Sequence, residues 1–386
     1  MIVGINLLSI LASALLSSRL VQKFVKRMNF LSYWMLTGLA LSPLPLLMDS
    51  TSFFGLVLVA AIVGLYFGLG LPILMGYYAA STETENRAGL SGVIILLSGV
   101  CFLSLSIMGS TDAALASIVL LFWRFGGLIL LILLKPREIN IDKSDHITYG
   151  AIITNSSLLL YFIPWLMFSL VNNLAFPILN NFFPANFVNI SSMLESVLAG
   201  FSALFFGFFA DFVGRKRLML FGFVLLGLGY AALGLFPGNS PGWWFYTCAD
   251  GVSWGVFTTI FLLTLWGDLA NKHNAEKYYV VGFLPYLLSN FLQVSIGQYV
   301  ADTVINEITV FSFASFFLFA SVLPLFYAPE TLPEKIIKDR DLKNYFERAQ
   351  KLAQKENGKI KKQDMEQTKK ENEEPEKPLS VRKLGS

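Results

Sequence analysis

Long apolar segments separated by short polar ones dominate the chain. Eleven of these segments are about as long as the roughly 20 residues that a helix needs to cross the hydrocarbon core of a bilayer. A helix satisfies its own backbone hydrogen bonds there, which an isolated strand does not. We therefore predict an all-α polytopic membrane protein, with spans at residues 3–18, 30–48, 53–80, 89–109, 113–134, 156–180, 188–210, 218–236, 243–269, 278–300 and 308–327.

Positive charge is distributed unequally among the loops. The loops after the odd-numbered spans contain thirteen Lys and Arg residues, and the loops after the even-numbered spans contain none. Because basic loops are retained in the cytoplasm, the first set is predicted to be cytoplasmic, together with the basic C-terminal tail. An odd number of spans then places Met1 on the outer face of the membrane, which we expect to be the plasma membrane.

Composition agrees with a membrane protein and excludes several other classes. The chain is 55% hydrophobic and 14% charged, whereas soluble domains contain about 25% charged residues. Cys101 and Cys248 both lie in apolar segments, so neither a disulfide scaffold nor a C-x-x-C motif is present. The chain has no P-loop, G-x-S-x-G or H-E-x-x-H motif. We expect no enzyme, no cofactor, no metal and no nucleic-acid partner; an intramembrane enzyme is a poor alternative.

A short charged segment between the seventh and eighth spans has a distinctive spacing, G-x-x-x-D-x-x-G-R-K, formed by Gly207, Asp211, Gly214, Arg215 and Lys216. The first glycine lets a neighbouring helix approach closely. The second can adopt the positive φ that ends a helix. The acid lies near a helix C-terminus, where the dipole disfavours negative charge, so it requires a positive partner.

This spacing resembles the signature loop of the major facilitator superfamily, a family of membrane transporters in which the loop recurs in each half of the fold. Pro329, Glu330 and Thr331, after the last span, resemble the P-E-T motif of that family. The resemblance implies two pseudo-symmetric helical bundles that work by alternating access. The third span lacks the buried arginine of proton-coupled members, and the fourth lacks the G-x-x-x-G-P signature, which argues against a drug–proton antiporter.

The sequence also contains a weak internal repeat. Residues 87–92 match residues 277–282, and the segment that begins at Ser18 matches the one that begins at Gly207, although Gln22 and Val25 replace the acid and the second glycine. Spans one to five thus correspond to spans seven to eleven, and span six has no partner. We expect a twelve-span architecture without its first span. The predicted parts are an N-terminal half (1–134), a cytoplasmic linker (135–150), a C-terminal six-helix half (151–330) and a charged, partly disordered cytoplasmic tail (331–386).

The charged segment is predicted to form a gate. Asp211 is expected to face the start of the tenth span, near residues 275–278, where helix N–H groups are unsatisfied. Arg215 is expected to pair with Asp268 at the inner end of the ninth span. Such a latch would hold the cytoplasmic side shut. The alternative is that the basic residues 215–217 only anchor the topology.

Three charges lie well inside predicted spans, where each costs roughly 2.5–3.5 kcal/mol and should face the bundle interior; a fourth, Asp268, lies at the end of its span. Arg124 is either an anion-binding or gating charge, or the structural partner of an acid on a neighbouring span. Glu195 and Asp250 are either coupling or substrate groups, or carboxylates hydrogen-bonded near the outer vestibule. Glu195 is the acid that we select for proton linkage, because burial favours its protonated form.

The candidate substrate site consists of Asn173, Trp254, Asn290 and Gln293. The amides offer donors and acceptors to a neutral polar solute, and the indole offers a stacking face. We therefore predict a secondary active or facilitative transporter, a symporter or uniporter, of a small polar solute, with membrane lipid as surroundings and protons as candidate coupling ions. The alternative is a non-transporting sensor or assembly partner that acts through the charged tail.

Overall fold

The computed structural model describes residues 1–20, 27–44, 52–109, 113–134, 136, 147–270, 274–303 and 306–332, with 342, 346 and 350 in the tail. The chain divides into two units, Met1–Pro333 and Glu334–Ser386, and the first contains the membrane-spanning helices. In the part of the chain that the structure describes, every regular element is a helix. Ten of these described helical segments are long and apolar enough to cross a membrane. The prediction of an all-α polytopic membrane protein is therefore confirmed.

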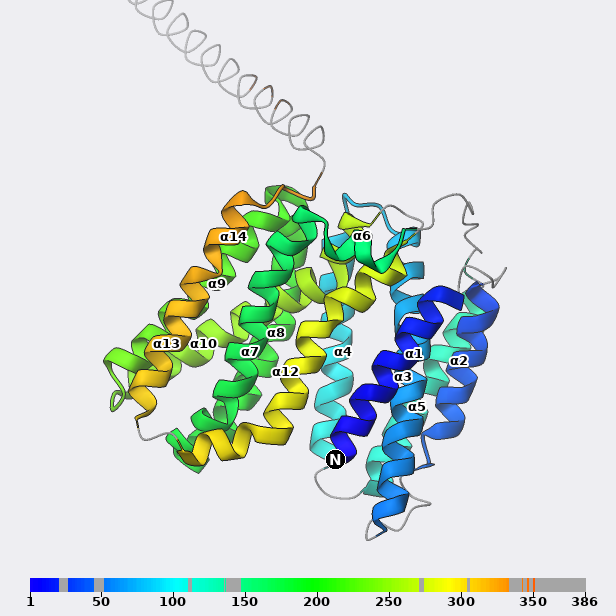
Figure 1. The fold of residues 1–386 in the computed structure, drawn as a ribbon, viewed down its shortest axis with the longest axis horizontal. Helices are drawn as coiled ribbons and strands as arrows, with labels where there is room; N and C mark the ends of the chain where they lie inside the picture. Colours follow the sequence, from blue (N-terminus) through cyan, green and yellow to red (C-terminus); the bar gives the residue numbers. More distant parts are fainter. Residues whose placement is uncertain are drawn as a thin grey trace, which may run out of the picture. The chain divides into compact units, whose positions relative to one another are not determined.

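The N-terminal half contains α1 (Ile2–Leu20), α2 (Arg27–Leu41), α3 (Phe53–Ser81), α4 (Arg87–Gly109) and α5 (Ala113–Leu134). The second expected span corresponds to α2, which has 15 residues; residues 45–51 lie outside the described part. The C-terminal half contains α6 (Tyr149–Ile153), α7 (Ser156–Phe182), α8 (Ala185–Val213), α9 (Arg215–Leu235), α10 (Ser240–Phe257), the π-helix η2 (Thr258–Thr264), α11 (Leu265–Leu269), α12 (Ala275–Thr303), α13 (Glu307–Ala320) and α14 (Val322–Tyr327) (Figure 1).

The halves meet at two places: α1 and α3 pack on α12, and α4 packs on α8 and η2. In the internal repeat, α1 corresponds to α8 and α4 corresponds to α12. The contact between α1 and α12 is therefore the repeat equivalent of the contact between α8 and α4. Within each half the same correspondence relates the α1–α3 pair to the α8–α10 pair. The two bundles are thus pseudo-symmetric, as the repeat in the sequence predicts.

Small residues allow α4 and α8 to pack closely against each other. A Cβ atom added to Gly207 would lie 2.6 Å from the carbonyl oxygen of Ala88. One added to Gly92 would overlap the backbone of Ala203. The two backbones therefore meet with no side chain between them, which is how helices without a hydrophobic driving force pack in a bilayer.

The C-terminal half has an aromatic core around Trp165, which is fully buried and donates from its Nε1 to the carbonyl oxygen of Gly282 at 2.9 Å. The Trp165 ring stacks on Phe261 with centroids 4.9 Å apart. Large apolar side chains such as Phe122 and Phe205 are exposed on the outside of the bundle. Lipid tails solvate such residues, so their exposure is consistent with a membrane environment.

Candidate functional site

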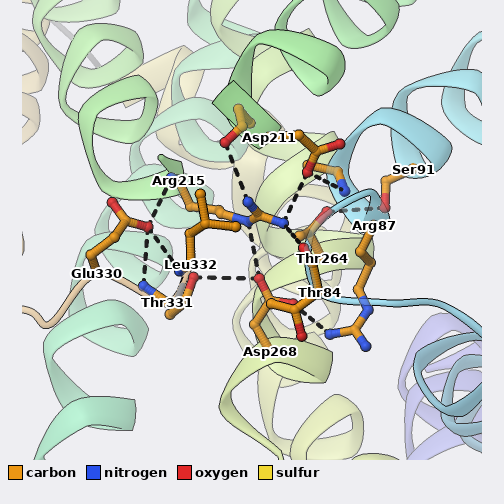
Figure 2. A network of polar contacts seen from close by, with 12 residues as sticks. Thr84, Arg87, Ser91, Asp211, Arg215, Thr264, Asp268, Glu330, Thr331 and Leu332 are labelled. Carbon is orange, nitrogen blue, oxygen red and sulfur yellow. Dashed lines mark hydrogen bonds and ion pairs between the residues drawn. The ribbon is translucent and has the colours of Figure 1, made fainter. Parts of the chain in front are cut away.

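Asp268, in α11, is the centre of a buried ion-pair network (Figure 2). Arg215 Nε donates to its Oδ2 at 3.1 Å, so the pair expected from the sequence is present. Arg87, at the start of α4, binds the other carboxylate oxygen and therefore ties the N-terminal half to the C-terminal half. Arg87 aligns with Lys277 in the repeat, but this pair could not be predicted, because no sequence pattern shows which helices cross.

The prediction for Asp211, at the end of α8, named the wrong partner helix. Its carboxylate accepts hydrogen bonds from the backbone N–H groups of Ala88 at 3.2 Å and Gly89 at 2.7 Å, in the first turn of α4, and not from the start of α12. Its Oδ1 also lies 3.0 Å from Arg215 Nη2. The predicted chemistry is present, since an acid meets unsatisfied helix N–H groups. The helix that supplies them belongs to the other half, because α8 packs on α4.

Glu330, from the P-E-T motif, caps the start of α9. Its carboxylate accepts from the N–H groups of Arg215 at 2.9 Å and Lys216 at 3.1 Å. An anion is stabilised there by the exposed N–H groups and the positive end of the helix dipole. Lys216 in turn donates from Nζ to the carbonyl oxygens of Phe326 and Ala328. The motif and the charged segment are therefore two parts of one structure.

A second ion pair joins the halves on the other side of this end of the bundle. Arg27, at the start of α2, binds Glu276, at the start of α12, and both side chains are buried. Gly76 of α3 leaves room for the carboxylate, because a Cβ atom there would overlap it. Arg27 belongs to the first-half segment that matches the charged loop in the internal repeat; Gln22, Val25 and Lys26 of that segment lie outside the described residues.

The same end also anchors the segment that enters the C-terminal half. Lys277 donates from Nζ to the carbonyl oxygen of Ile147 at 2.8 Å. The hydroxyl of Tyr149 is hydrogen-bonded to that of Ser18, in α1. Burial raises the pKa of Tyr149, so its hydroxyl keeps its proton at neutral pH. We refer to the contacts of Asp211, Arg215, Asp268, Arg87, Arg27 and Glu276 as the latch.

A cavity of about 760 Å³ lies at the other end of the bundle, lined by α4, α7, α8, α10, η2 and α12. Of the four residues proposed for the substrate, Asn173, Trp254 and Gln293 line it. Asn290 does not; it is exposed, and its assignment to the cavity was wrong. The face of α12 that carries Tyr286 and Gln293 turns toward the cavity, and Asn290 lies at the flank of that face.

Arg124 lies outside the cavity. Its Nη1 donates to the hydroxyl of Ser42 at 2.8 Å and to the carbonyl oxygen of Gly38, both in or beside α2. Its guanidinium also lies over the ring of Tyr66, 5.3 Å from the centroid. No acid among the described residues pairs with it, so the expected ion pair is not seen there. Carbonyl, hydroxyl and ring together solvate the charge between α2, α3 and α5.

A single helical segment connects the cavity with the latch. Trp254 and Thr258 line the cavity, while Asp268 lies ten residues beyond Thr258, in the latch. Between them is η2, in which the hydroxyl of Thr264 donates to the carbonyl oxygen of Thr259 at 2.8 Å. This bond to a residue five positions back supports the wider π-helical turn. Such turns are frequent at functional sites.

Comparisons with known proteins identify the fold. No family model matches the chain, and no curated protein sequence matches it. Among solved structures, the human organic anion transporter MFSD10 (TETRAN) is similar with a TM-score of 0.62 and 14% identity, over 84% of this chain and 82% of that one. A bacterial homologue of the iron transporter ferroportin, solved in an outward-facing state, gives 0.61 and 12%, over 83% and 86%. The proton:xylose symporter XylE gives 0.61 and 12%, over 85% of each chain.

These similarities establish that the chain has the fold of the major facilitator superfamily transporters. The identities are too low to transfer any substrate. What remains specific to this chain is the chemistry of its own cavity and latch.

Proposed function

We propose that this protein is a transmembrane transporter that moves a small solute by alternating access, either as a secondary active or as a facilitative carrier. The observation that supports this proposal most directly is the division of the bundle into two ends. One end has a cavity of about 760 Å³, and the other has buried ion pairs that join the two halves. A carrier in one of its two states requires this combination.

The latch consists of interactions that a rocking motion can break. Asp211 with α4, Arg87 with Asp268, and Arg27 with Glu276 each join one half to the other. Polar contacts of this kind release and re-form without the loss of packing that a large apolar interface would impose, since the charges become hydrated when the end opens. The unequal distribution of basic loops supports a cytoplasmic position for the latch, and with that topology the described state is one that is open to the outside.

A non-transporting sensor or assembly partner is the weaker alternative. Exposed lining residues such as Phe176 and Ser192 bring the cavity to the surface of the bundle. A binding site that reaches the surface at one end and is closed at the other suits transport of a small molecule. We propose membrane lipid and the plasma membrane as surroundings, with the C-terminal tail in the cytoplasm.

Cysteine labelling of the full chain in liposomes tests alternating access. Cys101 and Cys248 are first replaced by serine, and single cysteines are introduced at Ser192, which lines the cavity, or Ser91, which is fully buried beside the latch. We expect conditions that increase labelling at one position to decrease it at the other. Simultaneous labelling of both positions would indicate a channel, and labelling that never changes would contradict a carrier.

A further inference from the structure

The cavity contains two acids and no base. Glu195 and Asp250 line it, and none of its described lining residues is Lys, Arg or His. We propose that the cavity binds organic cations, in which an ammonium group carries an apolar or aromatic substituent. This inference rests on the proposed transport function and names its substrate class. It replaces the neutral solute expected from the amides of Asn173 and Gln293.

The two carboxyl groups come from adjacent helices that pack closely. A Cβ atom added to Gly251, in α10, would lie 3.0 Å from the carbonyl oxygen of Glu195, in α8. The absence of a side chain at Gly251 thus lets α10 approach α8 directly beside Asp250. Both acids consequently face one space from neighbouring walls. A single positive charge between them would interact with both.

Asp250 lacks the protein partners that a buried carboxylate requires. It is 5% exposed, and its Oδ1 has no hydrogen-bond partner among the described residues. The hydroxyl protons of two buried tyrosines in this region are used elsewhere, because Tyr246 donates to Tyr230 and Tyr230 donates to Asn172. Burial of an unpaired carboxylate is costly. A cationic ligand in the cavity would remove that cost.

No protein cation is placed to take this role. The sequence contains no Lys, Arg or His at residues 147–214, 218–271 or 278–334, which include the α7, α8, α10 and α12 walls of the cavity except for the first turn of α12. Arg124 is engaged with α2, as described above.

The remaining walls suit an organic cation better than a metal ion. Trp254 and Tyr286 meet edge to face with centroids 6.4 Å apart, and both line the cavity, with Phe102, Phe176, Phe183 and Tyr246. Aromatic faces attract ammonium groups and also cover apolar substituents. An alkali or alkaline-earth ion instead needs about six oxygen ligands. No group of three or more metal-ligating His, Cys, Asp or Glu occurs among the described residues.

Matched probes of opposite charge test the proposal. The purified full chain is titrated with benzyltrimethylammonium or with benzylsulfonate, and binding is measured by equilibrium dialysis and by thermal stabilisation. We expect the cation to bind and the anion not to bind. Glu195→Gln and Asp250→Asn should each weaken cation binding on the order of tenfold or more, because each removes one charge from a desolvated pair. Asp302→Asn, outside the cavity lining, is the control and should bind the cation as the parent chain does.

The outcomes separate this inference from the proposed function. The assignment of an organic-cation site would be overturned if both probes bound equally. It would also be overturned if neither Glu195→Gln nor Asp250→Asn lost cation binding. The Trp254→Ala variant keeps both acids and should also weaken cation binding. The test therefore does not depend on whether one acid variant folds. If the two ends label reciprocally but the cation does not bind, the proposed carrier function stands and only the proposed substrate class is contradicted. Cation binding without reciprocal labelling would instead contradict transport.

Discussion

The carboxylate of Asp211 accepts a hydrogen bond from the backbone N–H of Gly89, 2.7 Å away, across the boundary between the two halves. A negative charge at the end of α8 thereby neutralises the positive dipole at the start of α4. A Cβ atom added to Gly89 would lie 2.9 Å from the same carboxylate, so the short distance depends on a glycine in the first turn of α4. The bond exists only while these two helix ends remain together, and it can therefore report on the state of the latch.

Replacement of Asp211 by asparagine should open the latch. The change keeps the size of the side chain but removes a charge-assisted bond worth about 1.5–3 kcal/mol. We expect the ratio of latched to open molecules to fall by roughly ten- to a hundredfold, seen as increased labelling of a cysteine at Ser91. Arg217→Gln, at an exposed position in the same segment, is the control; if both variants label alike, loss of local charge rather than of the latch explains the change.

The Arg27–Glu276 ion pair should behave as a second, separable part of the latch. Arg27→Glu places two acids together in a buried site and should cost roughly 3–5 kcal/mol, with a corresponding increase in labelling at Ser91. The exchange Arg27→Glu with Glu276→Arg restores opposite charges and should recover much of the closed population. A double variant that labels as strongly as Arg27→Glu alone would show that the pair does not hold the halves together.

The helices and the repeat could be predicted from the sequence because apolar length and basic loops depend only on local chemistry. The pair between Arg215 and Asp268 could be predicted as well, since both residues lie at helix ends on the side with the basic loops. The partner of Asp211 could not, because α4 and α12 have equivalent N-termini, and only tertiary packing selects between them. Asn290 was placed wrongly for the same reason: helical periodicity identifies a face but not the angle at which that face meets a cavity.

Close approach of α4 and α8 should depend on Gly92. Its substitution by leucine would force a side chain into the backbone of Ala203 and separate the halves at their interface. We expect a large loss of thermal stability and of cavity binding. Gly99, on the same helix, has nothing within 4 Å of an added Cβ atom, so Gly99→Ala should unfold at the parental temperature. Equal stability of the two variants would show that the α4–α8 contact is loose.

Proton coupling, if present, should require Glu195. The titratable groups around it are Asp250 and Tyr246 on α10, Tyr230 on α9, and Tyr286 on α12, and α4 contributes no titratable group to the cavity. Glu195→Gln should abolish uphill uptake driven by a pH gradient but spare exchange measured at saturating substrate, because exchange needs no net proton movement and saturation offsets the weaker binding. Concentrative uptake at the normal rate by this variant would leave facilitated diffusion as the simpler mechanism.

Gly214 should be intolerant of any side chain, for two reasons that act together. Its φ of 104° with ψ of 153° lies in a region that is essentially restricted to glycine, at a cost of about 1–3 kcal/mol for other residues. A Cβ atom there would also lie 2.6 Å from Glu330 Oε2 and would displace the carboxylate that caps α9. Gly214→Ala should therefore lower the unfolding temperature and also increase labelling at Ser91, since the cap and the latch share Arg215.

Gly238, in a loop with open space around it and no positive φ, provides the matched control, and Gly238→Ala should change neither quantity. An unfolding temperature for Gly214→Ala equal to that of Gly238→Ala would mean that the turn is not under conformational constraint.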